Sequence, residues 1–511
     1  MTDPGQTIIE LLDAGAEHAP ALSAPGGKSL TYAALRSHVR TIVAALATQG
    51  IGANDRVAIV LDNGPDAASA FLSIGTAATA APLNPSYRAD EFEFYLADLR
   101  AKLLVIGQGK ESAAVEVATR LGIPIARLEP RPERGAGSFD LAFASGASSA
   151  PRATSPSRAT SDDIALVLHT SGTTSRPKIV PLAHKNVCAS AAHIRSTLAL
   201  TAGDRGLVIM PLFHIHGLVA ALLAPLAAGG EVTCTGGFNA LKFFAWMGEA
   251  RPTWYTGVPT MHQAVLLRAQ HNADVVRSHR LRFIRSSSSP LPPTVIAELE
   301  RVFNVPVIEA YGMTEAAHQM ASNPLPPGRR KAGTVGPAAG PEVRVVDPHG
   351  ESVPAGTPGE IVIRGPNVMR EYESNPKANA EAFYDGWFRT GDQGMLDAED
   401  YLSITGRLKE IINRGGEKIS PREVDEIIML HPAVHQCVTF ALPHKMLGED
   451  VAAAVVLRQG VAADDKELRA FASTRLAPFK VPSKILILPE IPVGATGKLQ
   501  RIGLAKKLGL A

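Results

Sequence analysis

The chain contains 511 residues, enough for roughly three domains at about 150 residues each. Lys and Arg number 51 and Asp and Glu 49, and this near-balance argues against a protein that binds nucleic acid through a basic excess. Apolar residues make up 45% and charged residues 20%, which indicates a folded globular protein rather than a disordered one.

Targeting and redox signals are few. The first residues lack the basic start and apolar core of a signal peptide, and the longest apolar run, 217–230, is too short to span a bilayer. Cys188, Cys234 and Cys437 lie far apart and show no metal-ligand spacing, so we expect buried, reduced thiols. These features predict a cytoplasmic protein without a membrane partner.

Over the first 400 residues, short apolar runs alternate with helical stretches. A helix is expected at 88–101, and strands are expected at 57–61, 102–107, 164–168, 206–210, 281–285 and 305–309. Continuous apolar strands separated by helices favour a largely parallel sheet covered on both faces, which is an α/β body. We expect the Ser- and Pro-rich stretch 135–163 to be a surface connection, and the alternating residues 359–365 to form a half-exposed antiparallel strand.

A second domain is expected to begin near residue 407. Ser420 can cap a helix that runs towards His431, with Pro421 in its first turn and Glu423 reaching back to the cap. Strands at 436–442, 452–457 and 484–488 and a helix from 465 complete a small α+β module. We therefore predict a large domain over 1–406 and a small mobile lid over 407–511.

A loop rich in hydroxyl groups follows the strand at 164–168. Four hydroxyl side chains, one glycine and one lysine suit a polyphosphate: Thr170, Ser171, Gly172, Thr173, Thr174 and Lys178. The loop does not match the Walker pattern, because no glycine precedes the lysine and no Ser or Thr follows it. The residues alone leave open a polar turn that caps the next helix.

This loop is the first of five segments that occur in a fixed order. The other four are 311–315 (YGMTE), 390–392 (TGD), 406–409 (GRLK) and 496–498 (TGK). Together they resemble the motif series of the ANL superfamily of adenylate-forming enzymes. The resemblance implies two steps: a carboxylate attacks the α-phosphate of ATP, releasing pyrophosphate, and a thiol then displaces AMP.

The resemblance also implies roles for individual residues in the first step. The loop residues named above would hold the β- and γ-phosphates, Thr314 would contact the α-phosphate, and Glu315 would bind Mg²⁺. Lys498 would bridge the acyl carboxylate and the α-phosphate. The remaining nucleotide contacts would come from Ser288, Glu309, Ala310, Tyr311, Gly312, Asp392 and Arg407, with Tyr311 against adenine and the last two on the ribose.

For the second step, the resemblance implies a lid that rotates at Lys409 and presents a face for the cosubstrate CoA. The residues expected at this face are Arg414, Gly415, Gly416, Glu417 and Lys480. For Lys480, anchoring of the lid remains an alternative to contact with a CoA phosphate.

The acid pocket is expected to be polar. Serines stand where the superfamily often has glycines, and imidazoles lie nearby, in a set formed by His214, His216, Ser287, Ser288, Ser289 and His318. Such a lining suits a small acid with a second carboxylate better than a fatty chain, because a buried anion needs hydrogen bonds or charge compensation. Packing or capping histidines are the alternative.

Several longer stretches, such as 211–217, 250–260, 282–286 and 411–420, are similar to oxalate–CoA ligases of plants and fungi. Two residues depart from the expected patterns: Ile179 replaces the glycine after the loop lysine, and Ser287 replaces a cysteine. The sequence therefore predicts an ATP- and Mg²⁺-dependent ligase that joins oxalate to CoA. The alternatives are a ligase for another short or aromatic acid, an enzyme that loads a carrier protein, and a nucleotide sensor without turnover.

Overall fold

The computed structural model describes residues 6–143, 159–170, 177–492 and 501–510. The chain divides into two compact units, the first formed by residues 1–343 and 363–388 and the second by residues 344–362 and 389–511. The predicted boundary between 406 and 407 stays a prediction. Among the described residues, no helix has the length and apolar character needed to cross a membrane.

A seven-stranded sheet forms one part of the first unit. Its strands, in spatial order, are β7 (Phe139–Phe143), β6 (Ile125–Pro130), β5 (Leu103–Gly107), β3 (Arg56–Val60), β4 (Thr79–Pro82), β8 (Ile164–Thr170) and β9 (Lys178–Ala183). The inner strands are parallel, and only β7 and β9 pair antiparallel with their neighbours. The accompanying helices are α1 (Ile8–Leu11), α2 (Tyr32–Thr48), α3 (Pro65–Ala77), α4 (Ala89–Leu99) and α5 (Ala113–Arg120).

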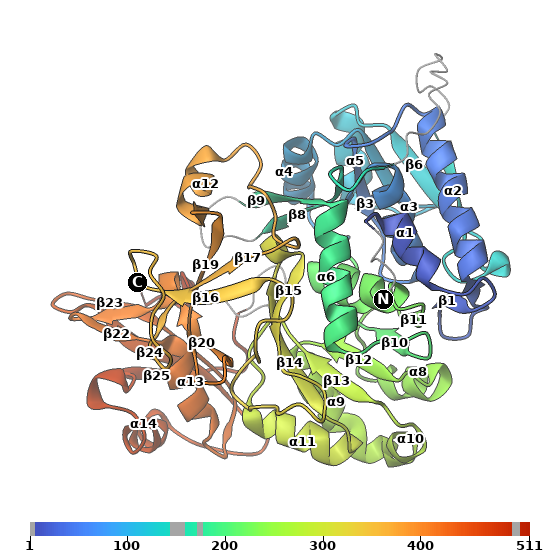
Figure 1. Ribbon diagram of the computed structural model, residues 1–511. Coiled ribbons are helices and arrows are strands. Elements are labelled where there is room, and N and C mark those ends of the chain that lie inside the picture. Colours follow the sequence, from blue (N-terminus) through green and yellow to red (C-terminus); the bar gives the residue numbers. More distant parts are fainter. Residues whose placement is uncertain (1–5, 144–158, 171–176, 493–500, 511) are drawn as a thin grey trace. The chain divides into compact units, whose positions relative to one another are not determined.

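An eight-stranded sheet forms the other part of the first unit. Its order is β15 (His318–Ser322), β14 (Val307–Met313), β13 (Phe283–Ser286), β12 (Trp254–Gly257), β10 (Arg205–Val208), β11 (Glu231–Cys234), β1 (Pro20–Ser23) and β2 (Leu30–Thr31). The helices here are α6 (His184–Thr197), α7 (Ala224–Leu226), α8 (Phe243–Ala250), α9 (Pro259–Ala269), α10 (Ala273–Ser278) and α11 (Pro293–Phe303), with a π-helix, η3 (His216–Leu223). Helix α6 contacts strands of both sheets and runs between them in Figure 1.

Both sheets have the apolar interior that the sequence predicts for parallel strands. Leu104 and Ile106 of β5 are fully buried, as are Phe283 and Ile284 of β13. Helices pack on these surfaces and contribute their own apolar residues to two separate core clusters. The predicted α/β body is therefore confirmed.

A five-stranded sheet follows, with the order β16 (Glu342–Val346), β17 (Gly359–Arg364), β19 (Trp387–Leu396) and β18 (Phe383–Tyr384), and with β20 (Leu402–Arg407) beside β19. Helix α12 (Pro376–Ala382) precedes β18. The expectation that 359–365 is half-exposed is wrong, because all four residues from Glu360 to Ile363 are buried. The Glu360 carboxylate tolerates burial since it accepts a hydrogen bond from Arg389 Nε at 2.7 Å.

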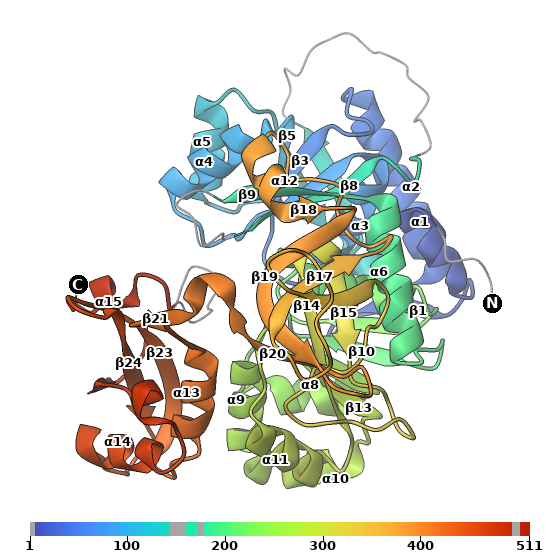
Figure 2. The same cartoon turned by 60° about the vertical axis from the view of Figure 1, so that its left-hand side comes forward.

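The part of the second unit that follows β20 is the predicted α+β module. Its sheet has the order β22 (Glu417–Ile419), β21 (Ile412–Arg414), β24 (Gly448–Leu457) and β23 (Val434–His444), with β25 (Lys484–Ile487) beside β24. Its helices are α13 (Pro421–Met429), α14 (Asp465–Ser473) and α15 (Leu504–Lys507). Figure 2 shows α13 alongside β23 and β24, and α13 contacts β23 extensively.

Two local expectations need correction. The stretch 135–163 is not only a surface connection, because its first part forms β7 and buries Phe139 against the sheet. The Ser420 side chain accepts from the amide of Glu423 as predicted, but no reciprocal bond forms. The Glu423 carboxylate instead pairs with the Lys480 ammonium at 2.7 and 2.8 Å. The Glu423 carboxylate binds the Lys480 ammonium instead of the helix cap because a hydrogen bond between two charged groups is stronger than one to a neutral backbone amide.

Candidate active site

Thr170 and Lys178 face each other across the antiparallel pair β8 and β9, which positions the two ends of the predicted phosphate loop. Residues 171–176 lie outside the described residues, so Ser171, Gly172, Thr173 and Thr174 remain predictions. Ile179 is buried in the core cluster of the seven-stranded sheet. Its side chain therefore packs in the first-unit core and does not replace a phosphate ligand.

The tyrosine Tyr372, which sequence reasoning did not single out, contacts both Lys178 and Glu315. The Lys178 ammonium lies 4.2 Å from the centroid of the Tyr372 ring, and the Tyr372 hydroxyl donates to Glu315 Oε1 at 2.7 Å. Glu315 is buried, so this bond holds its carboxylate in one position. The loop lysine and the predicted metal-binding carboxylate are thus brought together through one aromatic side chain.

The Thr314–His318 turn has a constrained backbone. Residues Thr314–Ala316 form a short 3-10 helix, η5, after which Ala317 and His318 adopt positive φ angles of 46° and 105°. A side chain at Gly312 would place its Cβ only 1.9 Å from the His318 carbonyl oxygen. The motif therefore needs glycine at 312 because β14 and β15 approach closely there. Positive φ at residues other than glycine is a form of strain that gathers at functional sites.

The predicted acid-pocket residues separate into two groups. His216, His318 and Ser287 are buried and Ser288 is half-buried, whereas Ser289 is exposed. His216 is the first residue of the π-helix η3. The next residue is Gly217, where any side chain would clash because its Cβ would lie 2.1 Å from the Pro211 carbonyl oxygen. π-helices are rare and occur frequently at functional sites.

His216 is the centre of the buried group. Its Nε2 lies 2.7 Å from Thr256 Oγ1 and its Nδ1 lies 3.0 Å from Ser288 Oγ. Its ring meets the His318 ring edge-on, with centroids 4.8 Å apart. Ser288 has a positive φ of 72°, and the Ser287 hydroxyl donates to the Ala310 carbonyl oxygen at 2.9 Å. The arrangement is a polar wall, with Thr256 as a member that the motifs did not reveal; its assignment to the acid pocket stays a prediction.

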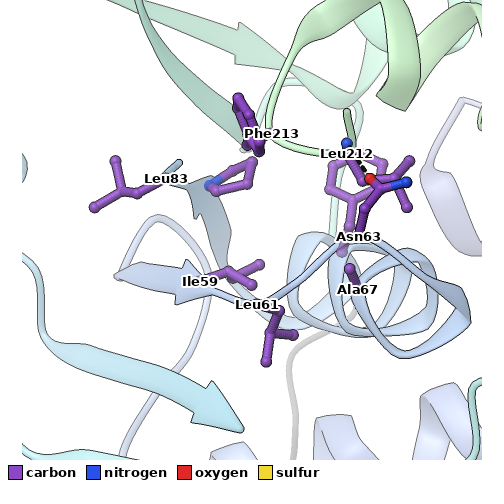
Figure 3. Close-up of a pocket in the computed structure, with 9 residues that line it drawn as sticks. Ile59, Leu61, Asn63, Ala67, Leu83, Leu212 and Phe213 are labelled. Carbon is purple, nitrogen blue, oxygen red and sulfur yellow. Dashed lines mark hydrogen bonds between the residues drawn. The ribbon is translucent and has the colours of Figure 1, made fainter. Parts of the chain in front are cut away.

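The half-buried His214 lies two residues before His216, and the neighbouring Leu212 and Phe213 line a small apolar cavity of about 10 Å³ (Figure 3). Asn63 is its polar residue, and its side-chain oxygen accepts from the Leu212 amide at 2.8 Å. Space for at most one water molecule and a mostly apolar lining make this cavity unsuitable for a charged acid.

The predicted adenine segment lies on β14. Glu309, Ala310 and Tyr311 are all buried, and Glu309 Oε1 accepts from the Leu291 amide at 3.0 Å. In the second unit, the predicted ribose pair is brought together, since Arg407 Nε lies 2.9 Å from Asp392 Oδ1. Asp392 is buried, so the guanidinium compensates its charge and fixes its orientation.

The residues predicted for the second step lie in the second unit. Gly415 and Gly416 have φ angles of 60° and 101° and form the tight turn between β21 and β22. Arg414 and Glu417 lie opposite each other in the strand register on either side of this turn. Arg414 Nε donates to Asp450 at 2.6 Å, and the exposed Lys409 lies in the 3-10 helix η6 (Leu408–Glu410). The ion pair of Lys480 with Glu423 supports the anchoring alternative for that lysine.

Lys498 lies outside the described residues. Three residues later, Arg501 is fixed within the second unit, where its Nη2 lies 2.7 Å from the buried Asp425 carboxylate. Burial raises the pKa of the three thiols, Cys188, Cys234 and Cys437, and none forms a disulfide. The expectation of buried thiols outside disulfides is confirmed.

The fold is that of an adenylate-forming α/β enzyme, as comparison with solved structures shows. The ATP-bound MatB of Rhodopseudomonas palustris superposes with a TM-score of 0.88 at 29% sequence identity, covering 98% of both chains. The AMP-binding enzyme family model matches residues 13–373, and the model of its C-terminal domain matches residues 423–498. The chain belongs to the AMP-binding enzyme family.

Curated relatives match over nearly the whole chain. An oxalate–CoA ligase of Arabidopsis thaliana is 42% identical over 97% of this chain and 97% of its own length. An oxalate–CoA ligase of Saccharomyces cerevisiae is 42% identical over 88% of this chain and 86% of its own. This chain is therefore an acid–thiol ligase of the acyl-CoA synthetase type.

Proposed function

We propose that this enzyme uses ATP to activate a small dicarboxylic acid, oxalate foremost, and transfers the acyl group to CoA. The observation that carries the choice of acid is the polar wall formed by the buried His216 and Thr256 and the half-buried Ser288. In it His216 lies 2.7 Å from Thr256 Oγ1 and 3.0 Å from Ser288 Oγ. A wall of hydroxyls and imidazole cannot solvate a long apolar chain, but it can replace water around a second carboxylate. The two oxalate–CoA ligase relatives support the same choice.

For the first step, Lys178 and the loop hydroxyls would neutralise the β- and γ-phosphates while the acid carboxylate attacks the α-phosphate. Glu315 fits Mg²⁺ because one buried carboxylate is enough for an ion that keeps several waters and binds the substrate phosphates. Bound Mg²⁺ would offset charge on the phosphates. Thr314 and Lys498 would contact the α-phosphate, and Asp392 with Arg407 would bind the ribose.

For the second step, we propose that the segment from Lys409 to Glu417 reorients so that the CoA thiol can attack the acyl-adenylate. The glycine turn at 415–416 has no side chain to obstruct the thiol arm. AMP leaves as the thioester forms.

Pyrophosphate release with ATP and Mg²⁺ tests the proposal, measured for oxalate, malonate, sulfoacetate, acetate, a medium-chain fatty acid and 4-coumarate, with and without CoA. We expect the largest kcat/KM with oxalate and sustained turnover only when CoA is present. A preference for an apolar or aromatic acid would overturn the assignment of the acid. Sustained turnover with a carrier protein and none with CoA would overturn the assignment of the acceptor.

A further inference from the structure

A fully buried arginine lies behind the polar wall. Arg285 is on β13, and its side chain has no exposed surface. Among the described residues it forms no ion pair with a carboxylate, and its Nε has no hydrogen-bond partner. Burial lowers the pKa of Arg285 to about 9, so the group still carries its charge at neutral pH. A buried cation without a counter-charge destabilises the folded protein, so we infer that the Arg285 charge serves the binding of an anion.

The guanidinium has two contacts. Nη2 donates to Gln319 Oε1 at 3.2 Å, and Nη1 lies 3.5 Å from Thr256 Oγ1. A guanidinium has donors and no acceptor, so Thr256 Oγ1 must accept at this contact. Thr256 then retains one hydroxyl proton to donate.

The direction of the next bonds follows from Thr256. This residue is buried, and the acceptor within reach of its hydroxyl proton among the described residues is His216 Nε2 at 2.7 Å. Because a buried hydroxyl proton is costly to leave unpaired, Thr256 donates to Nε2, and the His216 proton resides on Nδ1. Nδ1 then donates to Ser288 Oγ at 3.0 Å.

Ser288 is the end of the series. Its oxygen accepts from His216, so its own hydroxyl proton is available to an acceptor outside the four residues. Ser288 is half-buried, and its positive φ of 72° is a strained conformation that its surroundings must impose. Each donor in the series therefore points from the arginine towards Ser288, whose own hydroxyl proton is left to donate.

We propose that Arg285, Thr256, His216 and Ser288 form a hydrogen-bond relay whose terminal serine hydroxyl donates to the second carboxylate of the acid substrate. Ser288 contacts the substrate, while Arg285, Thr256 and His216 are positioning residues. The arginine fixes the polarity of every bond and supplies the positive charge that offsets the second carboxylate. The inference rests on the proposed function, since it requires an acid with a second anionic group.

The test compares kcat/KM for oxalate and for acetate in wild-type enzyme and in variants, with ATP affinity and thermal midpoint measured for each. Thr256→Val keeps the shape but removes the hydroxyl, Thr256→Ser keeps the hydroxyl, and Arg285→Met removes the charge. Arg282→Met is the matched control, because Arg282 lies just before β13 and pairs with Asp204 instead.

We expect Thr256→Val and Arg285→Met to lower kcat/KM for oxalate by about 10- to 100-fold, mainly through KM, as for loss of a hydrogen bond to a charged group. Acetate turnover and ATP affinity should change by less than about threefold, and Thr256→Ser should resemble wild type. Arg282→Met should resemble wild type in kcat/KM for both acids, although its thermal midpoint should fall because the buried Asp204 loses its guanidinium partner. The double variant should be little worse than either single variant, since both interrupt one relay.

Equal losses for oxalate and acetate, or unchanged oxalate turnover in Thr256→Val, would overturn the relay while the proposed function stood. A wild-type enzyme that activates acetate but not oxalate would overturn both. If Arg285→Met fails to fold, the comparison of Thr256→Val with Thr256→Ser still decides the question.

Discussion

At the scale of single residues, the position of Glu315 depends on Tyr372, which lies 57 positions later in the chain. The hydrogen bond between them measures 2.7 Å and is buried. The ring of the same tyrosine contacts the Lys178 ammonium. A tyrosine has one hydroxyl, so the contact with Glu315 and the ring face towards Lys178 can be separated by mutation.

Replacement of Tyr372 by Phe removes the bond to Glu315 and keeps the ring under Lys178. We expect the Mg²⁺ concentration for half-maximal activity to rise by about tenfold, because a partner that orients a metal ligand typically contributes 10- to 100-fold to metal affinity. The measurement is pyrophosphate release at varied Mg²⁺ and saturating ATP. Tyr384→Phe, at an exposed tyrosine, serves as the control. An unchanged Mg²⁺ dependence would contradict the role of Tyr372.

Buried histidines of the first unit make its stability depend on pH. The fully buried His184 accepts a hydrogen bond from the Ile8 amide at 3.2 Å through Nδ1, and burial lowers its pKa to about 4. Burial likewise lowers the pKa of His38 and of His262 to about 4. Between about pH 6.5 and pH 4 the unfolded chain binds protons that the folded chain does not. The contribution of these neutral histidines to the free energy of unfolding is therefore fully present above about pH 6.5, and it is lost as the pH falls from 6.5 to 4.

The asparagine variant of His184 isolates one of these groups, because its side-chain oxygen replaces Nδ1 as the acceptor and does not titrate. At pH 5, about 1.5 pH units below the pKa of histidine in the unfolded chain, the protein with His184 should have a free energy of unfolding about 2 kcal/mol lower than at pH 7. We expect thermal midpoints recorded from pH 7.5 to 5 to fall less steeply for His184→Asn. Parallel curves for the two proteins would show that His184 is not responsible.

At the scale of elements, the predictions succeeded where local pattern and tertiary environment agree. The continuous apolar runs at 57–61 and 102–107 became the buried parallel strands β3 and β5, and the Ser420 cap starts α13 as expected. They failed where a distant partner changed the outcome. Glu360 reads as the exposed side of a strand, but Arg389, 29 residues later, allows it to be buried.

The candidate site shows the same difference. The motifs pointed to His216, Ser288 and Glu315, because these residues stand at fixed positions within short segments. Thr256 and Tyr372 were missed as site residues. Thr256 lies in a stretch noted only for its similarity to relatives, Tyr372 lies outside the motifs, and the role of each depends on a contact across the fold. Contacts of this kind depend on which strands become neighbours, and no local pattern records that.

The junction of β14 and β15 gives a prediction at this scale. Gly312→Ala would force a Cβ against the His318 carbonyl oxygen, which is backbone and cannot move independently. We expect a loss of several degrees in thermal midpoint together with a fall in activity of about tenfold or more, because His318 and the Thr314–Ala316 helix shift together. Gly52→Ala is the matched control, since nothing lies within 4 Å of a Cβ there. Wild-type activity in Gly312→Ala would show that this turn tolerates displacement.

At the scale of the whole molecule, the residues proposed for the two steps are divided between the two units. Lys178, Glu315 and Ser288 belong to the first unit, and Lys409, Arg414 and Lys498 belong to the second. An enzyme that uses different residues for two successive reactions needs a conformational step between them, and such steps use a few residues that absorb changes in φ and ψ. We place this step at Lys409.

Proline at position 409 tests that assignment, because proline fixes its own φ and restricts the residue before it. Position 409 is in the first turn of η6, where proline is tolerated, and its side chain is exposed, so folding should be preserved. We expect Lys409→Pro to retain adenylation, measured by hydroxamate trapping of the acyl-adenylate, within about threefold of wild type. Thioester formation from ATP, oxalate and CoA should fall by about 100-fold or more, as is usual when a required closure is blocked.

Lys409→Ala removes the same ammonium without stiffening the backbone and should leave both steps nearly unchanged. If both variants lose thioester formation alike, the second step requires the lysine side chain and not rotation at 409. Unchanged thioester formation in the proline variant, or an equal loss of both steps in it, would remove the hinge from this position.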